Sequence, residues 1–138
     1  MDIEVQQFYM PAELVPAIRR LGSTVKIDPE WLPTRIVKDM WATEKPVGEH
    51  IDNTSDFKTT YGMVLINDAG QLLNYRGQIF GIPAGTMYRM DARYTHSTVG
   101  NNGLFVFYTW DKPHIETLAE IREHMLAFLR SRYMTGAE

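Results

Sequence analysis

Short apolar runs separated by turn residues occupy most of the chain. The clearest run is residues 59–67 (Thr-Thr-Tyr-Gly-Met-Val-Leu-Ile-Asn), which is rich in β-branched and aromatic side chains. Asp68-Ala69-Gly70 follows as a tight-turn signal, so we expect a hairpin in which residues 71–75 form the partner strand. Runs of the same kind predict further strands at residues 3–8, 23–27, 34–43, 78–82, 86–91, 95–99 and 104–110. Many short strands with frequent turns are typical of a β-sandwich or barrel.

Two segments show helical periodicity instead. Near the N-terminus, apolar residues at i, i+4 and i+7 predict a helix over about residues 11–21. Near the C-terminus, a longer apolar stripe predicts a helix over about residues 113–133, with Asp111 as its N-cap. We expect this second helix to pack on the outside of the sheet. Residues 1–138 are therefore expected to form a single domain, with a β core over about residues 34–110.

Composition narrows the class of protein. The 138 residues are 44% apolar and 22% charged, with a formal net charge of −3, which is ordinary for a soluble globular protein and gives no nucleic-acid footprint. No apolar run approaches the roughly 18 to 20 residues that cross a bilayer. The acidic start, Met1-Asp2-Ile3-Glu4, does not resemble a signal peptide, so we expect a cytoplasmic protein without a membrane partner. The absence of cysteine excludes disulfides, thiolate metal ligands and a Cys nucleophile.

Candidate chemistry is concentrated at His50-Ile51-Asp52. In an extended strand, side chains two residues apart point to the same face, here about 6.6 Å apart along the backbone. A third ligand from a non-adjacent strand would complete a set of two histidines and one carboxylate, which suits non-haem Fe(II) with open positions for oxygen chemistry. His96, far downstream, is the candidate for that ligand. The His-x-Asp triplet alone is weak evidence, because a histidine beside an Asp-Asn turn is common.

Together these features resemble the Fe(II)- and 2-oxoglutarate-dependent dioxygenases, which share the double-stranded β-helix, a jelly-roll or cupin-like fold. The resemblance extends from about Arg35 to Trp110. It consists of the His-x-Asp triplet, an apolar strand ending in Leu65-Ile66-Asn67, the turn Gly81-Ile82-Pro83-Ala84-Gly85-Thr86, and the aromatic-rich strand after His96. It implies a mainly β fold with flanking helices and an iron held by His50, Asp52 and His96. It also implies that 2-oxoglutarate and O2 are consumed while an unidentified substrate is hydroxylated.

One residue of the family pattern is missing. Such enzymes usually anchor the distal carboxylate of 2-oxoglutarate with an Arg or Lys on the strand after the distal histidine, but residues 104–110 contain no cation. A carboxylate buried without a counter-charge costs on the order of several kcal/mol. The candidate cations elsewhere are Arg35, Arg76 and Arg89. We favour Arg89, which lies mid-strand beside methionine, although it could also face solvent; Tyr61 and Tyr75 could donate a hydroxyl to the same carboxylate.

Two other functions stay open. Because the cation is missing, a cupin-type iron enzyme that does not use 2-oxoglutarate remains an alternative. The small size and short connections favour a catalytically inactive β-helix, whose histidines are ordinary polar residues and which serves as a binding or structural module. The prime substrate is not identified by the sequence, and the sheet edges and C-terminal helix offer surfaces for a homodimer.

Overall fold

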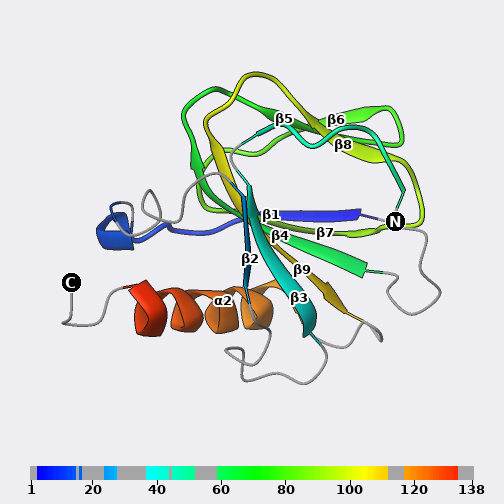
Figure 1. The fold of residues 1–138 in the computed structure, drawn as a ribbon. Coiled ribbons are helices and arrows are strands. Elements are labelled where there is room, and N and C mark those ends of the chain that lie inside the picture. The colour runs from blue at the N-terminus through cyan, green and yellow to red at the C-terminus, as the bar shows by residue number, and fades with distance from the viewer. Residues whose placement is uncertain are drawn as a thin grey trace.

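The computed structural model describes residues 3–14, 16, 24–27, 37–43, 45–51, 59–111 and 117–133. Within these residues the chain forms antiparallel strands followed by one long helix (Figure 1). The strands are β1 (Ile3–Gln7), β2 (Thr24–Ile27), β3 (Val37–Thr43), β4 (Thr59–Asn67), β5 (Leu72–Tyr75), β6 (Gln78–Gly81), β7 (Thr86–Asp91), β8 (His96–Val99) and β9 (Leu104–Asp111). All the strands predicted from apolar runs are confirmed over the residues that the structure describes; residues 23 and 34–36 of two of them lie outside that part.

The strands form two sheets. The larger has the order β1-β7-β4-β9-β3-β2 and the smaller the order β6-β5-β8. Residues 45–51 lie beside β8, because Thr98 N donates to Val47 O (2.9 Å) and His50 forms an antiparallel bridge with His96. From β3 onward the chain therefore passes back and forth between the two sheets, with β5 and β6 as consecutive strands of the smaller one. This is the predicted double-stranded β-helix.

The turn at Asp68-Ala69-Gly70 does not close a hairpin, so that expectation is wrong. β4 pairs with β7 and β9, whereas β5 pairs with β6 and β8 in the other sheet. The side chain of Asn67 holds the corner: its Nδ2 donates to Gln71 O (3.0 Å) and Ile82 O (2.9 Å), and its Oδ1 accepts from Gln71 N (2.9 Å). These bonds replace a hairpin ladder and direct the chain from one sheet into the other.

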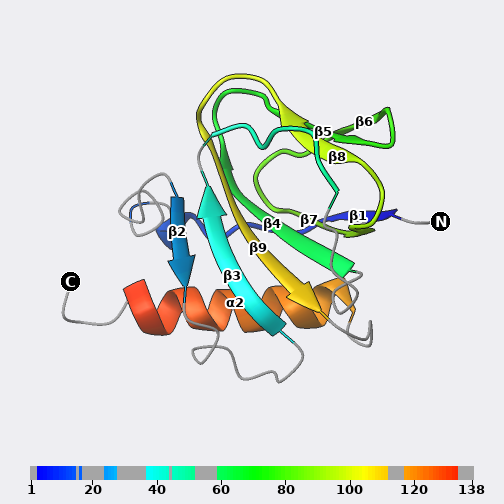
Figure 2. The ribbon, with the colours of Figure 1, turned by 45° about the vertical axis from the view of Figure 1, so that its right-hand side comes forward.

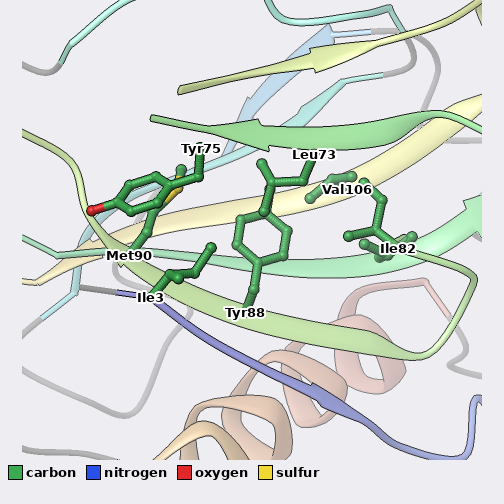
Figure 3. Close-up of a cluster of buried hydrophobic side chains, with 8 residues drawn as sticks. Ile3, Leu73, Tyr75, Ile82, Tyr88, Met90 and Val106 are labelled. Atoms are coloured by element: carbon green, nitrogen blue, oxygen red, sulfur yellow. The ribbon is translucent and has the colours of Figure 1, made fainter. Parts of the chain in front are cut away.

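An apolar cluster fills the space between the sheets (Figure 3). Side chains from β1, β4, β7 and β9 meet those of β5 there, and each is at most 7% exposed. Burial of each such side chain contributes about 1.5–3 kcal/mol. The cluster consists of Ile3, Val64, Leu73, Tyr75, Ile82, Tyr88, Met90 and Val106, and it contains no charged residue.

The other face of the large sheet is covered by the helix α2 (Leu118–Tyr133), as expected (Figure 2). The helix does not begin at Asp111, which is the last residue of β9, so that N-cap was predicted wrongly. Thr117 caps it: Thr117 Oγ1 accepts from Glu120 N (3.1 Å), and Glu120 Oε1 accepts from Thr117 N (2.9 Å). This reciprocal pair is a capping box.

The N-terminal helix expected over residues 11–21 lies largely outside the described residues. Within that stretch the structure describes a 3-10 turn, η1 (Ala12–Leu14). No helix among the described residues is long and apolar enough to span a membrane.

Candidate metal centre

His50 and His96 lie side by side across an antiparallel bridge. His50 N donates to His96 O (3.1 Å), and His96 N donates to His50 O (3.0 Å). Residues paired in this way direct their side chains to the same face. The two ring centroids are accordingly 4.3 Å apart, with an angle of 60° between the ring planes. The alternation between sheets thus brings together two histidines that are far apart in the sequence, as predicted.

Each histidine ring is fixed by a backbone carbonyl two residues earlier. His50 Nδ1 donates to Gly48 O (2.6 Å), and His96 Nδ1 donates to Tyr94 O (2.8 Å). A carbonyl oxygen can only accept, so Nδ1 carries the proton in both rings. In the neutral ring, Nε2 then carries the lone pair. Metal-binding histidines are commonly oriented in this manner, with one nitrogen held by a hydrogen bond and the other directed to the ion.

The pair lies at the boundary between the interior and the solvent. His96 is 5% exposed, whereas His50 is exposed. Tyr75 is the direct cross-strand neighbour of His96 on β5 and belongs to the apolar cluster, so His96 faces the space between the sheets. The Tyr75 hydroxyl donates to Asp91 O (3.1 Å), which links β5 to the end of β7. One side of the centre is therefore shielded from water.

Two imidazoles at this spacing fit a divalent transition metal such as Fe(II). With metal–nitrogen distances of about 2.1 Å, imidazoles at adjacent positions on one ion have ring centroids roughly 4.5–5 Å apart. Asp52, the expected carboxylate ligand, lies outside the described residues. Among the residues that are described, no group of three His, Cys, Asp or Glu side chains could hold an ion, so the described part of the site is the histidine pair.

Arg89 and Tyr61 lie on the opposite face of the large sheet. Arg89 alternates along β7 with Tyr88 and Met90, which face the apolar cluster. It forms an ion pair with Glu4 on β1 (2.7 Å), and Tyr61, its direct neighbour on β4, is fully buried. The structure therefore places Tyr75 beside the histidines, and it places Arg89 and Tyr61 away from them. Arg35 is outside the described residues.

Tyr94 contacts His96 through its carbonyl, although the sequence gave no sign of it, and Arg76 lies against the Tyr94 ring. The Arg76 guanidinium carbon is 4.0 Å from the centroid of the Tyr94 ring, and that ring meets Tyr75 edge-on at 6.4 Å. Tyr94 holds His96 through its backbone carbonyl, and a backbone contact of this kind leaves no mark in the choice of residue. The only available signal was its position two residues before a candidate ligand.

No protein-family model matches this chain, and no curated protein matches it by sequence. Solved structures do resemble it. A prolyl-4-hydroxylase from Pseudomonas putida has a TM-score of 0.57 at 14% identity, over 83% of this chain and 89% of that one. A 2OG-Fe(II) oxygenase family oxidoreductase from Burkholderia pseudomallei has a TM-score of 0.45 at 14% identity, over 59% of this chain and 48% of that one. A cupin 2 domain-containing protein from Halorhodospira halophila has a TM-score of 0.45 at 10% identity, over 100% and 98%.

These likenesses bear on the fold alone. The prolyl-4-hydroxylase matches nearly along its whole length, and it supports the double-stranded β-helix that the strand order shows. The chain spans less than half of the Burkholderia oxygenase. Function therefore has to be argued from the residues of the site.

Proposed function

We propose that this protein is an iron-dependent oxygenase whose metal is held by His50, His96 and Asp52. The observation that carries the proposal is the pair of adjacent imidazoles, each with its Nδ1 proton committed to a carbonyl. A histidine with no role needs no such orientation, whereas a site that presents two nitrogens to one ion needs two histidines oriented in this way. When bound, Fe(II) would supply the redox chemistry that activates O2.

The chain's own residues have three tasks in this proposal. The carbonyls of Gly48 and Tyr94 keep the proton on Nδ1 and so keep each Nε2 ready to ligate. The bridge between His50 and His96 fixes the relative position of the two rings. Tyr75 and the apolar cluster exclude water from the side of His96 that faces the interior.

We further propose that 2-oxoglutarate is the co-substrate in hydroxylation of an organic substrate. The support is the order of sequence features, from the His-x-Asp triplet through the distal histidine, in a chain that folds as a double-stranded β-helix.

A cupin-type enzyme that does not use 2-oxoglutarate is the second candidate, and one observation favours it. The buried residues that the structure describes include no Lys or Arg, so the described interior offers no cation to a buried dicarboxylate.

The metal centre is tested by titrating the metal-free protein with Fe(II) under anaerobic conditions and measuring binding by calorimetry. We expect one equivalent to bind. His50→Ala should weaken binding by about 100-fold or more, because loss of a ligand costs at least as much as loss of its outer-shell partner. His124→Ala, which removes a histidine from α2, is the matched control and should bind like the wild type. Equal binding by the wild type and His50→Ala would contradict the proposal and leave a binding or structural module.

The co-substrate is tested by adding 2-oxoglutarate to the iron-loaded protein under the same conditions. A visible charge-transfer band that requires both iron and 2-oxoglutarate would support chelation at the centre. Iron binding without that band would favour the cupin-type enzyme.

A further inference from the structure

The strand β6 forms an open edge of the smaller sheet. The sheet has the order β6-β5-β8, and the segment 45–51 continues it beyond β8. On the other side, within the part of the chain that the structure describes, β6 pairs with β5 alone. Figure 2 shows the β5–β6 hairpin projecting at the margin of the molecule. An edge strand of this kind presents N–H and C=O groups to any strand that comes beside it.

The hydrogen bonds of the hairpin show which groups of β6 face outward. Arg76 N donates to Thr95 O, so Asn74, two residues earlier on β5, directs its N–H and C=O toward β8. Asn74 and Ile79 are therefore opposite each other without sharing a hydrogen bond, and Ile79 directs its N–H and C=O to the open edge. Gly81, two residues later, does the same. β6 thus presents both donors and acceptors to a further strand.

The composition of β6 does not discourage pairing with another strand. Edge strands are commonly protected by a charged residue, a proline or a bulge. β1, at the edge of the larger sheet, carries Glu4. β6 consists of Gln78-Ile79-Phe80-Gly81, and its register with β5 shows no bulge. Because β5 and β8 also lack Asp, Glu, Lys and Arg, a strand added at this edge would meet none of these charges on the sheet.

The outer face of β6 has a projecting side chain beside a gap. Ile79 is 53% exposed. Gly81 is the next residue on the same face, and no described atom lies within 4 Å of the position that a Cβ would occupy there. Leu72, the cross-strand neighbour of Gly81 on β5, is 38% exposed. The strand therefore carries an apolar knob, Ile79, and an apolar hollow over Gly81 beside Leu72.

We propose that two copies of this chain pair antiparallel along β6, with Ile79 of each copy opposite Gly81 of the other. In this register the outward N–H and C=O groups of both residues form hydrogen bonds between the copies. Each Ile79 fills the hollow over the other copy's Gly81, beside Leu72. The result is a continuous sheet of order β8-β5-β6-β6-β5-β8 with a two-fold axis between the two Phe80 residues.

A second copy is the strand that this edge fits, because the knob and the hollow lie on one strand at the spacing that its own antiparallel copy requires. Neighbouring registers are less favourable. A shift by two residues places Ile79 opposite itself, so that Gly81 meets the turn residue Gly77, or opposite Pro83, which has no N–H to donate. The inference goes beyond the proposed function and does not involve the metal centre.

Sedimentation equilibrium of the metal-free protein tests the association. We expect a monomer–dimer equilibrium with a dissociation constant in the micromolar range, because a short strand edge forms a small interface. Ile79→Lys should raise that constant about tenfold or more, since each copy loses an apolar contact and brings a charge to the shared edge. Val99→Lys is the matched control. Val99 is 40% exposed on the same outer face, but it lies on β8, two strands from the edge, so the constant should not change.

Cysteine cross-linking tests the register, because the chain contains no Cys of its own. In the proposed pairing Phe80 lies opposite its own copy in a non-hydrogen-bonded pair, with Cα atoms about 4.5 Å apart, which a disulfide can bridge. Phe80→Cys should therefore form a covalent dimer under a mild oxidant. In Gln78→Cys the two cysteines would be offset by about 13 Å along the strands, so this variant should stay uncross-linked. Both positions are uncharged, and circular dichroism checks that each variant is folded.

The outcomes separate the inference from its alternatives. A wild-type protein that stays monomeric at millimolar concentration would overturn it. A dimer weakened equally by Ile79→Lys and Val99→Lys would overturn it in favour of contact between outer faces. Cross-linking of Gln78→Cys as readily as Phe80→Cys would overturn the register. Since Ile79 is exposed, Ile79→Lys decides the edge contact even if Phe80→Cys unfolds, and every measurement is made without metal, so the proposed function stands or falls separately.

Discussion

At the scale of single residues, small groups decide what the larger side chains can do. The carbonyls of Gly48 and Tyr94 set which nitrogen of each histidine is free of a proton. Gly62 has a comparable effect on the interior. It pairs directly with Tyr88, and a Cβ atom on Gly62 would lie only 2.3 Å from the Tyr88 ring. The Tyr88 ring lies across Gly62, so it can take its place in the apolar cluster only because residue 62 has no side chain.

Gly62→Ala should therefore destabilise the protein. The methyl group would force the buried Tyr88 ring or the strand to shift, and overpacking of this kind costs about 1–3 kcal/mol. Urea denaturation would measure the change in the free energy of unfolding. Gly81→Ala is the matched control on β6, since nothing lies within 4 Å of its added Cβ and its φ is not positive. A Gly62→Ala protein as stable as the control would contradict this prediction and show that Tyr88 can move aside at little cost in free energy.

Sequence reasoning at this scale succeeded in expecting two histidines that are far apart in the chain to lie side by side. His50 and His96 were expected together, and the bridge places them so. It failed where the position of a side chain depends on which face of its strand it occupies. Arg89 was favoured over Arg76 as the anchoring cation, yet the alternation along β7 turns Arg89 away from the histidines. One sequence shows that a strand alternates, but not which of its two faces meets the second sheet.

At the scale of elements, the positions of strands were predictable and their partners were not. Turn residues mark where strands end, so β4 and β7 were predicted with their observed bounds. The same residues gave a false hairpin at Asp68-Ala69-Gly70, because Asn67 turns the chain into the other sheet. A local signal identifies a turn but not the sheet that the next strand joins.

The start of α2 could have been predicted from a local sequence motif, which the sequence analysis did not use. Thr117-Leu118-Ala119-Glu120 has the spacing of a capping box, and the box is formed. Hydrogen bonds from the backbone and side chain of Thr117 lower the pKa of Glu120. The carboxylate is thus favoured in the folded state. Its contribution to stability is fully present above the unfolded pKa, about 4.3, and is lost as the pH falls through the lower folded pKa.

Thr117→Ala should remove the cap and the part of this contribution that comes from the Thr117 side chain, whereas the backbone N–H of residue 117 can still donate to Glu120. We expect a loss of about 1 kcal/mol of unfolding free energy at neutral pH. The loss should shrink as the pH falls below about 4, because the Glu120 carboxylate is then protonated in the wild type and in the variant, and the wild type no longer gains from stabilising its charge. Urea denaturation between pH 3 and 7 would measure both effects. A Thr117→Ala loss that does not change with pH would contradict this account.

At the scale of the whole molecule, the proposed metal would join two parts of the fold, the segment 45–51 and β8. The segment 45–51 meets β8 through the His50–His96 bridge and the contacts of Val47 with Thr98. An ion shared by His50 and His96 would add a cross-link there. Because the histidine pair requires the folded chain, the ion should bind the native state in preference to the unfolded one.

Metal should therefore raise the temperature of unfolding. At a free Mn(II) concentration 100 times the dissociation constant, linkage gives about 2.7 kcal/mol. For a domain of this size that corresponds to an increase of roughly 10 °C. Circular dichroism melts with Mn(II) and with a chelator would measure it. His96→Ala should abolish the increase while His124→Ala retains it. An equal increase in His96→Ala would mean that the ion binds elsewhere, and the histidine pair would then be a structural feature of the barrel.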